Sequence, residues 1–173
     1  MSTTTTENDL AGKWRALLET EPKLRIRDAA QRLGVSEAEL LATRVGNGVK
    51  RLEGDWKEVI KEFPRLGRVM CLTRNENAVH ERYGIYREIA FFGHGAGMGQ
   101  VVGPDIDLRL FMGSWVHGFA VTDETKEGPR QSLQFFDGTG TAVQKIYLQP
   151  ESDLAACEEI VAKYLAADQN APV

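Results

Sequence analysis

Long apolar runs are absent from this 173-residue sequence, and both cysteine and histidine are scarce. A transmembrane helix needs about 20 consecutive apolar residues, and a secretory signal needs a basic stretch followed by an apolar one. Neither pattern is present, so we expect a cytoplasmic protein that does not insert into a membrane.

The two cysteines, Cys71 and Cys157, stand far apart, without a Cys-x-x-Cys spacing and without neighbouring histidines. This arrangement argues against a zinc site or a disulfide framework and predicts reduced, structural thiols. The formal net charge of -4 also gives no general attraction to nucleic acid.

One domain is expected, because 42% hydrophobic residues supply one core and the length lies within the range of single domains. Residues 1–7 are polar and threonine-rich and are predicted to form a disordered tail, while residues 168–173 are predicted to form a loose carboxyl-terminal tail. The expected domain therefore spans residues 8–167.

The domain begins with helical periodicity and continues with strand periodicity. Helices are predicted from Asn8, over 26–33, from Ser36, over 56–63 and from about Ser152. Ser36 and Glu39 have the spacing of a capping box. Between Gly67 and Leu148 the apolar period is two, and the predicted strands are 69–73, 83–91, 106–111, 115–122, 131–136 and 142–148.

Asp137 and Gly138 supply left-handed turn chemistry before the last of these strands. The order of elements predicts an α+β fold with amino-terminal helices, a curved antiparallel β-sheet and a carboxyl-terminal helix.

Residues 27–43 have the alanine, glycine and leucine spacing of a helix-turn-helix, so a DNA-binding regulator is the alternative function. The second helix opens with Glu37 and Glu39, however, which would bring carboxylates to the phosphates of DNA. We therefore favour a packed helical hairpin and expect no specific nucleic acid partner.

The glycine-rich stretch 93–99 does not match a nucleotide-binding motif. Met98 stands where the dinucleotide motif requires glycine, and no Gly-Lys-Ser/Thr follows. A flexible turn or a bend in the sheet is the favoured interpretation.

The three histidines differ in what they are able to do. His80 is flanked by polar residues, among them Asn77 and Glu81, that are able to fix a neutral imidazole tautomer for a metal. His94 lies among glycines, as a solvent-facing turn residue would, and His117 shares a predicted sheet face with aromatic residues. Spacing alone does not decide between a structural role and a ligand role for any of them.

Strand alternation places Leu108 and Leu110 on one face and Asp107, Arg109 and Phe111 on the other. An arginine beside an aromatic ring suits a flat, anionic ligand. The same pattern is equally compatible with a surface ion pair between Asp107 and Arg109, which would contribute little energy.

Three strings resemble, in the expected order, the amino-terminal repeat of the HemS/ChuS-type haemin-degrading and haem-trafficking family. They are LGRVMCLTRNENAVHE (66–81), DIDLRLFMGSW (105–115) and RQSLQFFDGTGTAVQKIYL (130–148). With the helical opening and the final helix, the resemblance covers nearly the whole chain. It implies a cytoplasmic protein that receives imported haem and, in several members, degrades the ring with an electron donor or peroxide.

The resemblance assigns site residues to this chain. It implies that His80 coordinates the haem iron, that Arg109 lines the haem pocket and that Phe111 is the apolar companion of Arg109. Arg74 is a further candidate for pairing with a haem propionate, and no catalytic residue is assigned. The usual second repeat, with its better-established axial histidine, is absent, so we favour haem carriage over self-sufficient degradation and leave enzymatic activity open.

Related single-repeat proteins pair as dimers that mimic the two-repeat architecture. The resemblance therefore implies a homodimer built by sheet-to-sheet contact. The expected partners are haem (iron protoporphyrin IX), the haem-import machinery and a haem oxygenase.

Overall fold

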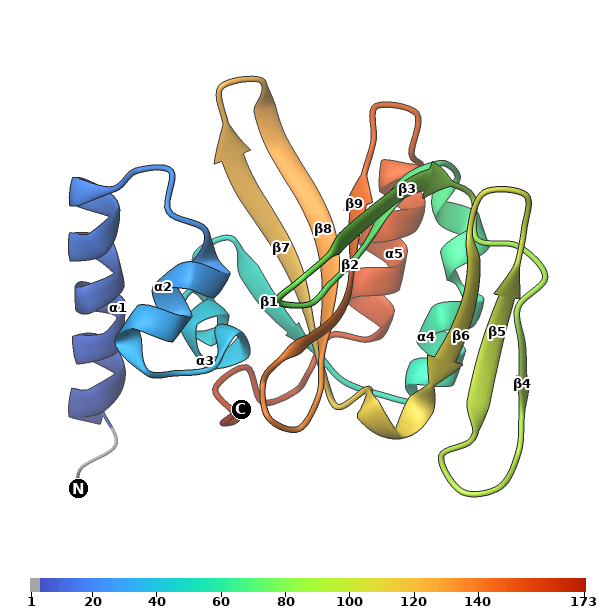
Figure 1. The fold of residues 1–173 in the computed structure, drawn as a ribbon, viewed down its shortest axis with the longest axis horizontal. Coiled ribbons are helices and arrows are strands. Elements are labelled where there is room, and N and C mark those ends of the chain that lie inside the picture. Colours follow the sequence, from blue (N-terminus) through green and yellow to red (C-terminus); the bar gives the residue numbers. More distant parts are fainter. Residues whose placement is uncertain (1–3) are drawn as a thin grey trace.

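Helices and antiparallel sheets together build the chain, whose computed structural model describes residues 4–173 (Figure 1). This architecture confirms the predicted α+β fold. The α-helices are α1 (Thr4–Thr20), α2 (Ile26–Leu33), α3 (Glu37–Ala42), α4 (Trp56–Lys61) and α5 (Leu154–Lys163). Two short 3-10 helices are η1 (Phe63–Leu66) and η2 (Met112–Ser114).

The strands form two antiparallel sheets, a division that the sequence pattern did not predict. The larger sheet has the strand order β1 (Val49–Leu52), β7 (His117–Thr125), β8 (Gly128–Phe136), β9 (Ala142–Leu148), β2 (Val69–Arg74) and β3 (Val79–Gly84). The smaller sheet has the order β4 (Ala90–Phe92), β5 (Met98–Val102) and β6 (Asp107–Phe111).

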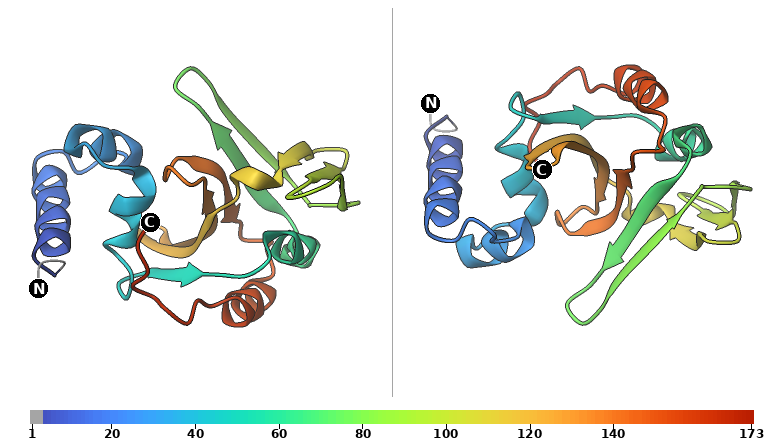
Figure 2. Two further views of the ribbon diagram at one scale, coloured as in Figure 1. Left: turned by 90° about the horizontal axis from the view of Figure 1, so that it is seen from below. Right: turned by 90° about the horizontal axis from the view of Figure 1, so that it is seen from above.

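The six-stranded sheet curls in the middle of the molecule, with α1–α3 at one end and the three-stranded sheet at the other (Figure 2). One face of the six-stranded sheet packs against α4, η1 and α5, and buries aromatic residues that include Phe63, Tyr86 and Phe135. Because buried aromatic side chains contribute large apolar areas, this cluster is the main core.

Local sequence accounts for the helical hairpin of α2 and α3. Helix α2 ends where predicted because Gly34 adopts a left-handed conformation with φ 69°. The capping box at α3 is confirmed: Ser36 Oγ accepts from the Glu39 backbone N–H at 3.1 Å, and Glu39 Oε2 accepts from the Ser36 N–H at 2.7 Å.

The strand prediction is partly wrong. The predicted 142–148 strand is confirmed as β9, whereas the predicted single strand 83–91 splits into β3 and β4, which lie in different sheets. Between them Tyr86 turns into the core and Glu88 has a positive φ of 45°. The last turn also differs, because the left-handed residue is Gly140 (φ 79°) and not Gly138.

Both ends of the chain include residues that were predicted to form tails. Helix α1 begins at Thr4, inside the predicted tail 1–7, and residues 1–3 lie outside the described part. In the carboxyl-terminal segment 168–173, Gln169 Oε1 accepts from the Arg51 backbone N–H at 2.8 Å, and the Pro172 carbonyl accepts from Arg51 Nη2 at 3.0 Å. None of the described helices is both long and apolar enough to cross a bilayer.

Candidate functional site

The outer face of the three-stranded sheet combines an apolar row with a polar one. Cross-strand pairing aligns Phe92, Met98 and Phe111 in one row. The adjacent row aligns Ala90, Gln100 and Arg109. Residues paired directly across antiparallel strands project from the same side, so these two rows form one surface, which we call the Phe111 face.

The Phe111 face is exposed because the opposite face of the same sheet is already used. Val101 and Leu110 point into the main core and are buried. Gly99 is required there, since a Cβ atom at this position would stand 2.6 Å from the Phe91 ring. Phe111 is left 66% exposed and Phe92 45% exposed. An exposed apolar row of this kind is typical of a binding surface.

Arg109 sits beside the apolar row and is free to engage an anion. Its guanidinium donates to Asp107 Oδ1 at 2.7 Å and to the Leu108 carbonyl at 3.0 Å. The side chains of the Arg109–Asp107 pair are 50% and 60% exposed, and an ion pair so exposed contributes little energy. The surface pair considered from sequence therefore exists, and it leaves Arg109 able to exchange partners.

His94 lies at one end of the Phe111 face, a position that sequence reasoning did not reveal. It belongs to the turn that follows Phe92 and precedes Met98, and it is exposed. The flanking Gly93 and Gly95 have φ values of 95° and 65°. The pairing of β4 with β5 places this turn at the end of the apolar row, and no short sequence motif carries that signal.

His80 and Arg74 lie in the other sheet, on opposite faces of the β2–β3 hairpin. His80 pairs with Thr73 across the hairpin, whereas Arg74 pairs with Val79. Since side chains alternate along a strand, His80 projects from the face opposite to Arg74. His80 is exposed. The structure thus places Arg109 and Phe111 on one face of the three-stranded sheet, and His80 and Arg74 on opposite faces of a hairpin of the six-stranded sheet.

His117 has a structural environment between β1 and the carboxyl-terminal segment. Its Nδ1 lies 3.2 Å from Arg51 Nη2, so a neutral ring accepts this hydrogen bond. Burial lowers the pKa of His117, and the positive charge of Arg51 lowers it further.

Both cysteines are free and buried. Burial raises the pKa of the Cys71 thiol, and it raises the pKa of Cys157 to about 11. Thiols with raised pKa values are poor nucleophiles at neutral pH. The Cys71 sulfur lies 3.2 Å from the Tyr86 hydroxyl inside the core.

The packing of α3 contradicts the helix-turn-helix alternative. Four of its six residues are buried, namely Glu37, Ala38, Leu40 and Leu41. Glu37 forms an ion pair with the buried Lys145 of β9. A recognition helix must expose the residues that contact bases, and α3 turns most of its surface into the protein.

A family model for the haemin-degrading HemS.ChuX domain matches residues 34–164. The chain is 39% identical to hemin transport protein HemS of Yersinia enterocolitica over 143 residues, which cover 82% of this chain and 41% of that protein.

Two solved structures share both sequence and fold with the chain. Holo-PhuS, a heme-binding protein from Pseudomonas aeruginosa, is 47% identical with a TM-score of 0.91, over 96% of this chain and 48% of PhuS. ChuS, a heme degrading enzyme from Escherichia coli O157:H7, is 34% identical with a TM-score of 0.88, over 94% of this chain and 48% of ChuS. The chain spans less than half the length of these relatives.

Proposed function

Since this chain belongs to the haemin-degrading HemS.ChuX domain family, we propose that it is a cytoplasmic haem-binding protein of bacterial haem uptake. We propose further that it carries haem to or from a partner of the uptake system, such as the import machinery or a haem oxygenase. The relatives HemS and PhuS, a hemin transport and a heme-binding protein, support this proposal.

The observation that best supports haem binding is the Phe111 face itself. Haem is a flat apolar ring with two propionates, and it needs an apolar wall beside a cation. Phe92, Met98 and Phe111 form such a wall, and Arg109 lies in the next row of the same sheet. In this proposal Phe111 packs on the haem ring, and Arg109 either pairs with a propionate or faces the ring.

For the axial ligand we keep His80 as the proposed residue, because the resemblance assigns it. His80 lies in β3 of the six-stranded sheet, so the assignment needs a direct comparison with His94. The decisive measurement is the Soret spectrum of the haemin complex, since the axial ligand sets the electronic state of the iron.

A haemin titration of the purified chain tests the proposed site. We expect one saturable site per protomer, and we expect Arg109→Gln to weaken haemin binding about tenfold because a charge-assisted contact is lost. Arg32→Gln is the matched control: Arg32 is 49% exposed and pairs with Glu21, and it lies in α2, outside the strands that carry Arg109 and His80. Equal affinity of the Arg109→Gln and Arg32→Gln variants would remove Arg109 from the site.

The same titration with His80→Ala and His94→Ala identifies the ligand. A change of the Soret spectrum in His80→Ala alone supports the proposed assignment. A change in His94→Ala alone transfers the role to the turn between β4 and β5 and ends the assignment of His80.

Adding a reductant to the haemin complex distinguishes haem carriage from haem degradation. If the chain carries haem, the Soret band of its complex persists in ascorbate and no iron is released. Bleaching of the band together with iron release, in the presence of catalase to exclude free peroxide chemistry, would show that this single domain degrades the ring.

A further inference from the structure

A cavity lies between the amino-terminal helices and the six-stranded sheet, away from the Phe111 face. Its volume is about 650 Å³. The wall on the sheet side comes from β2, β3, β7, β8 and β9, and along β2 the side chains of Met70, Leu72 and Arg74 alternate toward it. The helical wall comes from α1, the loop after it and the start of α2. A hydrogen bond from Arg27 Nη1 to the Asn75 carbonyl, 2.6 Å long, joins the two walls.

The charge of this cavity is opposite to that of the whole protein. Seven basic and four acidic side chains line it, although the chain carries a net charge of -4. Four of the basic residues form no ion pair with the acidic side chains of residues 9–173, namely Lys23, Arg25, Arg27 and Arg74. A lining of this composition favours an anionic ligand.

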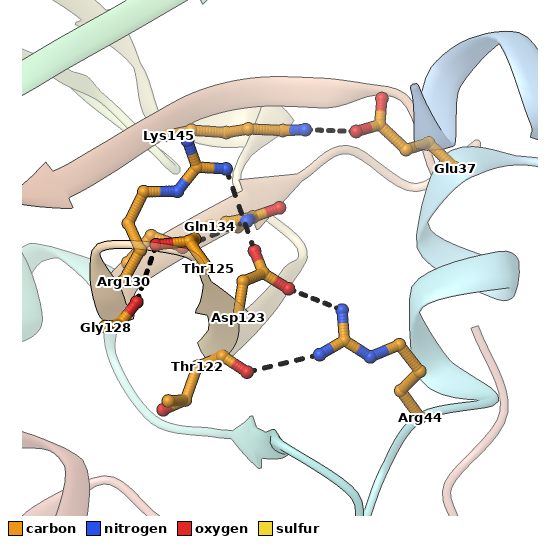
Figure 3. A network of polar contacts seen from close by, with 10 residues as sticks. Glu37, Arg44, Thr122, Asp123, Thr125, Gly128, Arg130, Gln134 and Lys145 are labelled. Atoms are coloured by element: carbon orange, nitrogen blue, oxygen red, sulfur yellow. Dashed lines mark hydrogen bonds and ion pairs between the residues drawn. The ribbon is translucent and has the colours of Figure 1, made fainter. Parts of the chain in front are cut away.

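The other basic groups of the lining are already occupied (Figure 3). Arg44 Nη1 donates to Asp123 Oδ1 at 2.7 Å, and Lys145 pairs with Glu37. Arg130 Nη2 lies 3.9 Å from Asp123 Oδ2, and the Arg130 guanidinium lies over the Tyr147 ring. This network neutralises the floor of the cavity. The four basic side chains without an ion pair lie near Arg74 and the start of α2, and they outnumber Glu81 and Glu124, the two acidic side chains of the lining that form no ion pair.

Arg74 is the residue of this lining best suited to bind an anion. Its Nε atom is buried and has no hydrogen-bond partner in the structure. A guanidinium remains charged at all accessible pH values, so a buried donor on it is costly unless an acceptor pairs with it. Helix α2 begins beside it without a side-chain cap, since Arg25 occupies the N-cap position. Its free backbone N–H groups add to the anion-binding character of this end.

Apolar side chains form another part of the lining. Leu72, Met70 and Tyr147 line the sheet side, Trp14 and Leu18 line the helical side, and Val79 remains 49% exposed at the hairpin. We propose that this cavity binds an amphipathic carboxylate, such as a fatty or aromatic acid. The carboxylate pairs with Arg74 near the start of α2, and the apolar body lies along Met70, Leu72 and Tyr147.

Calorimetric titration with decanoate, compared with decanol, tests this assignment. We expect one saturable decanoate site per chain and at least about tenfold weaker binding of decanol, because only the acid pairs with the guanidinium. Arg74→Gln is expected to weaken decanoate binding about tenfold and to leave decanol binding unchanged. Equal binding of acid and alcohol, or no saturable binding of decanoate, overturns the proposal.

Arg82→Gln is the matched control, because Arg82 lies in the same hairpin but projects from the opposite face. It is expected to bind decanoate as the wild type does; an equal loss in both variants would mean a non-specific charge effect and would refute the site. Arg25→Gln, at an exposed position of the same cavity, gives a second variant if Arg74→Gln does not fold. Unchanged decanoate affinity in Arg25→Gln would then overturn the placement of the carboxylate.

Haemin distinguishes this cavity from the proposed haem site. We expect saturating haemin to leave decanoate binding unchanged, and Arg109→Gln to leave it unchanged as well. If haemin displaces decanoate and Arg74→Gln weakens both ligands by the same factor, the cavity is a haem site and a separate site for carboxylates is refuted.

Discussion

At the scale of single residues, His117 shows how a buried contact makes stability depend on pH. Burial, and then the charge of Arg51, lower the pKa of His117 in the folded chain. The unfolded value is about 6.5. The folded state therefore holds the imidazole neutral, and the unfolded state takes up the proton first as the pH falls.

We expect the free energy of unfolding to fall as the pH drops below about 6.5 toward the lower folded pKa, and His117→Asn to reduce this loss. Asparagine keeps an acceptor for Arg51 but does not titrate. Urea unfolding at about pH 7.5 and about pH 5.5 measures the difference, with His94→Asn as a control at an exposed turn position. An identical pH dependence in the wild type and His117→Asn would show that His117 does not contribute.

The sequence predicted the relative placement of site residues only where they lie in the same strand. Alternation within one strand correctly placed Arg109 and Phe111 on the same exposed face. No such rule relates His80 to them, because that relation depends on how two separate sheets are packed.

At the scale of elements, the short helix α3 depends on its cap. Only six residues form it, and its buried face holds Glu37 against Lys145. A helix this short is not stable alone, so its end contacts matter more than intrinsic propensity.

Ser36→Ala is therefore expected to lower the free energy of unfolding by about 1 kcal/mol, through loss of the acceptor for the Glu39 N–H. Glu39→Gln, which preserves the reciprocal contact to the Ser36 N–H, is expected to cost much less. Chemical denaturation followed by circular dichroism measures both. A wild-type unfolding curve for Ser36→Ala would mean that the cap contributes nothing.

At the scale of the whole molecule, the exposed aromatics of the Phe111 face also bear on assembly. We propose that, in the absence of haem, two chains form a homodimer by sheet-to-sheet contact, as the resemblance implies, and that their Phe111 faces meet in it. Covering Phe111, which is 66% exposed, would remove apolar area from water.

Light scattering of the haem-free protein is expected to give twice the chain mass of 19.2 kDa. Phe111→Ser is expected to shift the protein toward the monomer. The control Leu154→Ser removes a similarly exposed apolar residue at the start of α5 and should leave the dimer intact. A monomeric wild type at all concentrations would rule out the dimer.

Local sequence patterns predicted much of the architecture. The errors in the strand prediction come from tertiary packing, which these patterns do not encode. Helix α2, the cap of α3 and strand β9 follow from periodicity and side-chain chemistry within a few residues. The break between β3 and β4 does not, because Tyr86 leaves the strand to fill the core. Strand β5 was hidden because Gly99, a residue unfavourable in strands, is required by the close approach of Phe91.

The amino-acid sequence by itself determined the α+β class, the ends of several elements and, through three ordered strings, the family. Tertiary structure alone decided that the strands divide into two sheets, that His94 lies beside the Phe111 face and that Arg74 faces a separate cavity. The reason is physical: side-chain periodicity acts over a few residues, whereas the meeting of two sheets depends on contacts between residues far apart in the chain.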